Sequence, residues 1–207
     1  MTAPSPVFAE TYQHYLQQIG NIDFRIVQKR LDITVEKDNA FIPLLNRSYM
    51  VSPKGIVDEN GKQPGLDVCI ILFRYLLMAP DLQARTTCWV AFRDLKDSGP
   101  LTVYWKNEVE SAIAETFSNR MEDLSDACRR LNGVLPEERL PYDLSQRFRL
   151  LPKIPALLLF NRKDHEFPAS CSVLFDRHAD QYLDAESLAI LGSIFAGRLQ
   201  TLNPDNV

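Results

Sequence analysis

Apolar residues recur at helical spacing near the start of the chain. A first set of aromatic and aliphatic positions lies mostly three or four residues apart and predicts a helix that ends at Gly20: Phe8, Tyr12, Tyr15, Leu16 and Ile19. Phe24, Val27 and Leu31 then fall on one face of a shorter helix that Asp23 can cap.

The pattern changes after Ala40 to short apolar runs with turn residues between them. Residues 41–45 and 48–51 are typical of short strands. Ser52-Pro-Lys-Gly55 predicts a turn, and Asn60-Gly61 is a dipeptide common in hairpins. The first half of the chain therefore combines helices with a small antiparallel sheet.

A helix that is apolar almost all round follows, with Asp67 as its expected cap, Met78 as its end and Pro80 as its stop. Such a helix is buried. Residues 89–95 fit either a strand or a helical turn. From Val109 to Leu131 apolar residues again recur at helical spacing, until Asn132-Gly133 ends the pattern. Residues 134–141, with two prolines and three charges, predict a surface loop.

The last third of the chain predicts strands followed by a helix. Phe148 and Leu150 alternate with arginines ahead of Pro152, which is typical of an edge strand. The apolar runs 155–160 and 171–175 predict adjacent antiparallel strands in the centre of a sheet. A final helix should pack on that sheet through Leu188, Leu191, Phe195 and Leu199, with Gly192 and Gly197 admitting close neighbours.

This order of elements lacks the regular strand–helix alternation of a doubly wound sheet. It predicts the α+β class, an antiparallel sheet covered by helices, in a single domain over residues 1–207. A chain of this length buries a full core without disulfide or metal staples.

Charge and hydropathy narrow the function classes. A net charge of −4 argues against nucleic-acid binding, which depends on clustered Lys and Arg. The longest hydrophobic stretch, residues 68–79, is too short to span a bilayer and contains Arg74. The N-terminus lacks the basic and apolar regions of a secretory signal. We therefore expect a cytoplasmic protein with no nucleic-acid or membrane partner.

The four cysteines, Cys69, Cys88, Cys128 and Cys171, are far apart and form no C-x-x-C pair. This spacing predicts no zinc or iron–sulfur site. Their apolar neighbours predict buried thiols in a reducing compartment.

Chemistry is best sought between residues 154 and 186. Asp164, His165 and Glu166 stand side by side, and Asp176, His178 and Asp180 follow after the second apolar run. Two interpretations are open: the groups bind a ligand or act as acid and base, or they are solvated turn residues and helix caps. A hairpin would place the first group in its connection and the second beyond the returning strand, which weakens the case for one site.

Two single residues add to this picture. Asp176 lies where a buried strand meets a polar turn, and we expect it to be a buried or half-buried structural carboxylate. Arg74, within an apolar helix, requires a carboxylate partner or an opening onto a cavity, and a structural ion pair is the favoured interpretation. The candidate ligand-binding residues are Asp164, His165, Glu166, His178 and Arg74.

Four segments carry a family resemblance: Leu151-Pro-Lys-Ile-Pro155, Asp164-His-Glu-Phe-Pro-Ala169, Val173-Leu-Phe-Asp176 and Tyr182-Leu-Asp-Ala-Glu186. With the N-terminal tyrosine-rich helix and residues 72–77, they resemble small proteins of anaerobic bacteria and archaea catalogued as domain of unknown function 3786. Relatives of this kind are sometimes joined to iron–sulfur domains, which implies redox or cofactor metabolism. This chain has no cysteine-rich segment to hold a cluster.

Two function classes follow. The first is a non-catalytic protein that binds a small molecule or a protein partner, in the setting of anaerobic redox or cofactor metabolism. The second is a hydrolase that uses the His, Glu and Asp groups of residues 164–180, with or without a divalent metal. The sequence specifies no cofactor, ligand, partner or oligomeric state, and it leaves open whether the protein is an enzyme.

Overall fold

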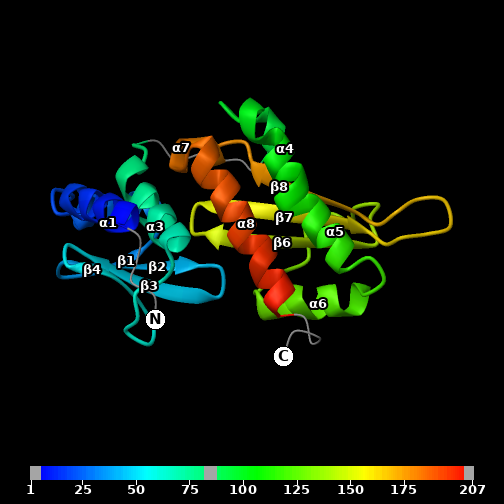
Figure 1. Cartoon of the computed structure of the whole chain (residues 1–207), viewed down its shortest axis with the longest axis horizontal. Coiled ribbons are helices and arrows are strands. Elements are labelled where there is room, and N and C mark those ends of the chain that lie inside the picture. Colours follow the sequence, from blue (N-terminus) through cyan, green and yellow to red (C-terminus); the bar gives the residue numbers. More distant parts are fainter. Residues whose placement is uncertain (1–5, 82–87, 203–207) are drawn as a thin grey trace.

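The computed structural model describes the backbone of residues 6–81 and 88–202, with side chains from residue 9 onward. Within these residues the chain forms helices and two antiparallel four-stranded sheets. The expected α+β class is confirmed, but the strands are divided between two sheets, one in each half of the chain. Figure 1 shows the two halves side by side along the longest axis.

The first sheet is a meander in which each strand pairs with the next one along the chain. The two predicted apolar runs became its central strands, and the Ser52–Gly55 turn connects β3 to β4. Asn60-Gly61 lies in a turn after β4, where no further strand of this sheet follows. The strands are β1 (Thr34–Glu36), β2 (Asn39–Leu44), β3 (Arg47–Ser52) and β4 (Gly55–Asp58).

Three helices accompany this sheet: α1 (Pro6–Ile19), α2 (Phe24–Leu31) and α3 (Leu66–Met78). Asp23 caps α2 as expected, by accepting a 2.9 Å hydrogen bond from the Arg25 amide. The expected cap of α3 was wrong, since Gly65 is its N-cap and Asp67 lies in the first turn. The apolar character of α3 is explained by burial, because most of its side chains lie in the core.

The second sheet has the strand order β5-β8-β7-β6. The predicted pairing is confirmed: β7 and β8 are adjacent, antiparallel and central, with Phe160 opposite Cys171. The predicted edge strand, β6, lies at the edge. Residues 89–95, which fitted either a strand or a helical turn, form a short strand followed by a 3₁₀ turn at Phe92–Asp94. The strands are β5 (Trp89–Ala91), β6 (Leu144–Leu151), β7 (Ile154–Asn161) and β8 (Ser170–Asp176).

The helical pattern predicted from Val109 to Leu131 is interrupted. A 3₁₀ turn at Gly99–Leu101 leads into one continuous helical segment, which passes through a π-helical stretch at Lys106–Ser111. The chain then turns at residues 117–120 before the next helix begins. The helices of this half are α4 (Thr102–Trp105), α5 (Ala112–Thr116), α6 (Met121–Arg130), α7 (Ala179–Tyr182) and α8 (Ala185–Thr201).

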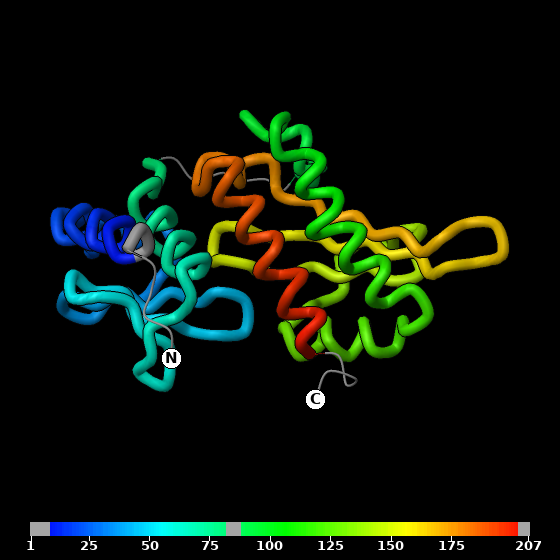
Figure 2. The backbone as a smooth tube through the Cα atoms, viewed as in Figure 1, coloured from blue at the N-terminus to red at the C-terminus, as the bar shows by residue number. Residues whose placement is uncertain are grey.

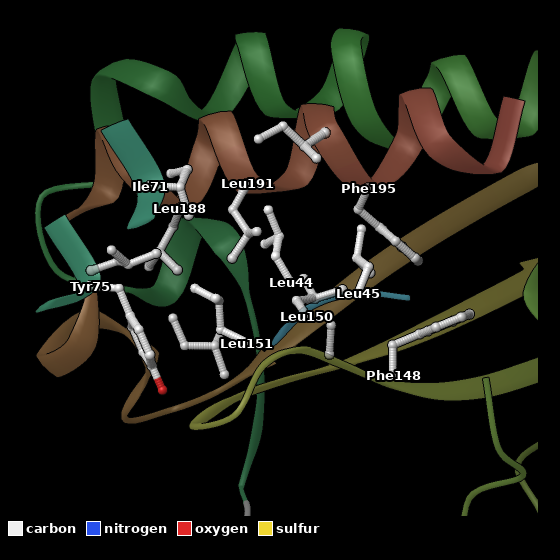
Figure 3. Packing of buried hydrophobic residues seen from close by; sticks show 14 of the residues in the cluster. Leu44, Leu45, Ile71, Tyr75, Phe148, Leu150, Leu151, Leu188, Leu191 and Phe195 are labelled. Carbon is white, nitrogen blue, oxygen red and sulfur yellow. The ribbon is translucent and has the colours of Figure 1, made fainter. Parts of the chain in front are cut away.

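Helix α8 packs on the second sheet, as the sequence predicted. The rings of Phe195 and Phe148 meet edge to face with their centroids 4.8 Å apart, and Figure 3 shows Leu188 and Leu191 directed toward Leu151 and Leu150. Gly192 does admit a close neighbour, because a Cβ there would lie 2.2 Å from the Trp105 ring. The expectation for Gly197 was wrong, since a Cβ there would meet nothing within 4 Å.

One hydrophobic core runs through both halves of the chain. In Figure 3, Leu44 of β2 and Leu45 of the following turn lie beside Leu150 of the second sheet and beneath α8. Cys69, Cys128 and Cys171 are buried in this core as expected, but Cys88 is exposed, because it lies at the surface just before the short edge strand β5. In the part of the chain that the structure describes, no helix is both long and apolar enough to cross a membrane.

Candidate functional site

Asp164, His165 and Glu166 lie in the connection between β7 and β8, which projects beyond the rest of the sheet in Figure 2. All three are exposed. One carboxylate oxygen of Asp164 accepts the amide hydrogens of Glu166 and Phe167, at 2.8 and 2.7 Å. Hydrogen bonding to these amides, that of Phe167 first, lowers the pKa of Asp164. Asp164 therefore stabilises a turn.

Asp176 and His178 lie at the other end of β8, separated from the connection by a strand of about 20 Å. Asp176 is buried, as predicted. Its Oδ2 accepts the amide hydrogen of Cys88 at 3.0 Å, and its Oδ1 accepts that of His178 at 2.9 Å. Nδ1 of His178 also lies 3.0 Å from Oδ1. These bonds connect the residue before β5 to the N-cap residue of α7.

Arg74 forms an ion pair with Asp184, in agreement with the favoured interpretation. Asp184 is also the N-cap of α8, where it accepts the amide hydrogen of Ser187 at 2.9 Å. The pair therefore joins the middle of α3 to the start of α8. The guanidinium of Arg74 is therefore engaged in a structural ion pair.

The predicted site residues thus lie in three separate places: the β7–β8 connection, the end of β8 and the α3–α8 contact. Among the described residues, no three His, Cys, Asp or Glu side chains come together as a group suited to a metal ion. The sequence pattern grouped these residues because they are close along the chain, whereas a seven-residue strand separates two of the groups in space.

A groove of about 750 Å³ lies elsewhere, at the junction of the two halves. Its walls are the start of α3 with the residues before it (64–70) and one face of α8 (190–201). Arg47 and Tyr49 of β3 and Tyr104 of α4 complete it. Figure 1 shows α3 and α8 side by side, each from a different half of the chain. The groove therefore exists only in the folded protein.

The lining of the groove is mainly apolar, with a few polar groups at defined positions. Leu66, Ile70, Ile190 and Ile194 contribute side chains from the two helices. The hydroxyls of Tyr104 and Ser193 are 3.0 Å apart and hydrogen-bonded at one side. Gly197 leaves open space at the α8 wall. An apolar cavity with few polar groups is the usual form of a small-molecule site.

Arg198 is the charged group of the α8 wall, and its side chain is half-buried. Its guanidinium donates one hydrogen bond of 2.8 Å to the carbonyl of Leu44 and one of 2.9 Å to the hydroxyl of Tyr49. No carboxylate of the described residues forms a salt bridge with it. Burial lowers the pKa of Arg198, although an arginine remains protonated at neutral pH.

Three further charged residues line the same groove: Arg47, Asp58 and Asp67. Arg47 is exposed and close enough for its charge to lower the pKa of Arg198. Asp58 uses one oxygen to accept the amide hydrogens of Asn60 and Lys62, both at 2.9 Å. Asp67 is exposed in the first turn of α3, and its charge raises the pKa of Arg198, which opposes the effect of Arg47.

Sequence reasoning missed Arg198. The available signal was a guanidinium on an otherwise apolar helix, the same signal that identified Arg74. In the last turn of α8, however, a cation is also favoured by the helix dipole, so an arginine there has an ordinary explanation. Its partners, Leu44 and Tyr49, come from the other half of the chain.

Comparison with known proteins gives one match. A family model with the description Domain of unknown function (DUF3786) matches residues 23–198. No curated protein and no solved structure matches the chain. The matched range covers both sheets and the residues that line the groove, apart from Thr201.

Proposed function

The chain belongs to this family, Domain of unknown function (DUF3786), and we propose that it is a binding protein that holds a small molecule in the groove between α3 and α8. The family description names no activity, so the proposal rests on the chain's own residues. The observation that carries it is Arg198, a half-buried cation in a mainly apolar groove that forms no salt bridge with a carboxylate of the described residues.

A partly buried charge is costly when its partners are neutral, and proteins usually pair it with an opposite charge. Arg74 has such a partner in Asp184, whereas Arg198 has a carbonyl and a hydroxyl. The volume of the groove, about 750 Å³, lies within the range of cavities that hold cofactors and metabolites. A bound molecule would cover both the apolar walls and the cation.

The hydrolase alternative requires the groups of residues 164–180 to surround one reacting atom. His165 and Glu166 are exposed on the β7–β8 connection, and His178 lies beyond the far end of β8. No observation in the described residues favours this alternative over the binding protein.

The test uses Gly197, which lines the groove and where an added Cβ would meet no atom within 4 Å. Gly197→Phe should fill the groove without a clash in the α8 wall. Wild type and variant are purified side by side and compared by native mass spectrometry and by ligand-observed NMR with neutral, acidic and basic fragments. We expect fragments or a co-purified molecule that bind the wild type and are lost in Gly197→Phe. Ligands that bind both proteins equally would place the site elsewhere and refute the proposal.

A further inference from the structure

We infer that the ligand of this groove is an organic acid, whose carboxylate binds Arg198 and Arg47 and whose apolar body lies between α3 and α8. The inference rests on the proposed function, because it names the chemical class of the molecule bound at the same site. Three features of the groove support it.

The first feature is the unused hydrogen-bonding capacity of Arg198. A guanidinium has five N–H donors in a planar fork that matches the two oxygens of a carboxylate. Two of these donors are used, one by the Leu44 carbonyl and one by the Tyr49 hydroxyl. Both partners are neutral, so they hold the guanidinium in place without neutralising it. An acid at the groove would add charge-assisted hydrogen bonds to a donor group that is already positioned.

The second feature is Arg47, the next cation at the same groove. It comes from β3, two residues before Tyr49, and forms no ion pair with a described carboxylate. Two guanidinium groups that face one cavity repel each other, and an anion between them removes that repulsion. A neutral or cationic molecule would leave it in place.

The two aspartates at the groove work against an acid, but more weakly. Asp67 is at an exposed position, where water and salt screen its charge, and Asp58 is half-buried. Asp58 accepts two amide hydrogens within its own turn, and the N-terminus of α3 offsets part of the charge of Asp67. Arg198 is more buried than Asp67, and Asp58 is engaged by amides of its own turn, so Arg198 has the stronger effect inside the groove.

The last feature is the apolar wall that continues from the cation. Ile194 and Ile190 lie one and two turns before Arg198 on α8, and Leu66 and Ile70 lie on α3 across from them. An acid without an apolar part would leave this wall exposed to water. The expected ligand therefore combines one carboxylate with an aliphatic or aromatic body.

The test uses probes that share a body and differ only in the charged group. 4-Phenylbutanoate, 4-phenylbutanol and 4-phenylbutylamine form one set, and octanoate, octanol and octylamine form a second set of different shape. Binding is measured by ligand-observed NMR and calorimetry at low and high salt. We expect an acid of at least one set to bind about tenfold or more tightly than its alcohol, with the amine weakest. Added salt should weaken the acid alone.

Variants assign the effect to the groove. Arg47→Gln removes an exposed charge, so the fold should be unchanged while acid binding weakens about three- to tenfold and alcohol binding stays constant. Arg198→Lys keeps the positive charge and loses the planar pair of N–H donors, and it should also weaken binding of the acid while binding of the alcohol stays constant. Because Arg198 supports the fold through Leu44 and Tyr49, Arg47→Gln is the decisive variant.

The outcomes separate the two levels of the proposal. If neutral or amine probes bind best and Gly197→Phe abolishes their binding, the groove is a ligand site and the inference of an acid is wrong. If acids bind but neither Arg47→Gln nor Gly197→Phe weakens them, the acids bind elsewhere and the inference is again wrong. If no acid binds with a Kd below about 10 mM, the inference is overturned even where the fragment screen finds other ligands.

Discussion

The amide of Leu45 donates a 2.8 Å hydrogen bond to the carbonyl of Leu150, and this bond joins the two sheets. Leu45 lies in the β2–β3 turn with a φ of 55°, a conformation that a bulky residue seldom adopts. Its side chain is buried, with 8% of its surface exposed, and Figure 3 shows it beside Leu150. The contact with the second sheet thus accounts for the left-handed turn, and it holds together the halves that form the groove.

This contact predicts that the two halves unfold together. Both tryptophans, Trp89 and Trp105, belong to the second half, so tryptophan fluorescence reports on that half while far-UV circular dichroism reports on both. Since one core runs through the molecule, we expect the two signals to give coincident denaturation curves. Separate midpoints would mean that the halves are independent folding units.

Asp176→Asn should destabilise the fold by about 1–2 kcal/mol. The carboxylate accepts backbone amides on both of its oxygens, and an asparagine would present an NH₂ group to one of these donors. Urea denaturation measures the change. His165→Ala and Glu166→Ala are matched controls at exposed positions and should stay within about 0.5 kcal/mol of wild type. A control as unstable as Asp176→Asn would contradict the assignment.

Two glycines of α8 should respond to alanine in opposite directions. Gly192→Ala places a Cβ 2.2 Å from the Trp105 ring, and we expect a loss of about 1–3 kcal/mol from the displacement of that buried indole. Gly197→Ala meets no atom within 4 Å and should raise stability by about 0.5–1 kcal/mol through helix propensity. Thermal unfolding of the two variants tests this. Equal shifts in Tm would rule out the clash with Trp105 as the cause of the loss.

Asp184 has two separable roles, as the N-cap of α8 and as the partner of Arg74. Asp184→Ala removes both and should cost about 1–2 kcal/mol. Asp184→Asn retains a good cap and loses only the charge. Since the Arg74 and Asp184 side chains are 34% and 35% exposed, solvent weakens the pair and the loss should be below about 0.5 kcal/mol. If both variants lost the same free energy of unfolding, the ion pair and not the N-cap would be the main contribution of Asp184 to stability.

The four cysteines should react unequally with a thiol reagent at pH 8. Cys88 is exposed, whereas burial raises the pKa of Cys69 and of Cys128 to about 12 and also raises that of Cys171. Because the thiolate is the reactive form, we expect rapid labelling of Cys88 and labelling of all four residues after unfolding. Cys88→Ser should abolish the rapid phase. Rapid labelling in that variant would show that a core thiol is accessible.

Stability should fall at alkaline pH. The thiols of Cys69 and Cys128 titrate near 9.0 when unfolded, and their pKa rises to about 12 in the folded protein because burial disfavours the thiolate. Above pH 9 the unfolded chain loses these protons and the folded chain keeps them, so the free energy of unfolding decreases from about pH 9 to 12. Urea denaturation at pH 8 and pH 11 should show a smaller decrease for Cys128→Ala than for wild type; an equal decrease would contradict this origin.

The local pattern of apolar and polar residues was sufficient to predict those elements whose buried positions follow one another closely along the chain. The apolar runs 155–160 and 171–175 became β7 and β8, because a strand buried on both faces is apolar throughout. The spacing of Leu188, Leu191 and Phe195 located the face of α8 that meets the sheet. Asp176 was recognised because a carboxylate between a buried strand and a turn has backbone amides within reach.

By itself, then, the sequence determined the α+β class, the β7–β8 pairing, the packed face of α8 and the structural role of Asp176, since each depends on residues close along the chain. Only the tertiary structure decided the division into two sheets, the left-handed turn at Leu45 and the groove. Arg47 and Arg198 both line this groove although they are far apart along the chain. Periodicity reports whether a side chain faces core or solvent, but which elements pack together depends on the fit of their surfaces in the folded chain.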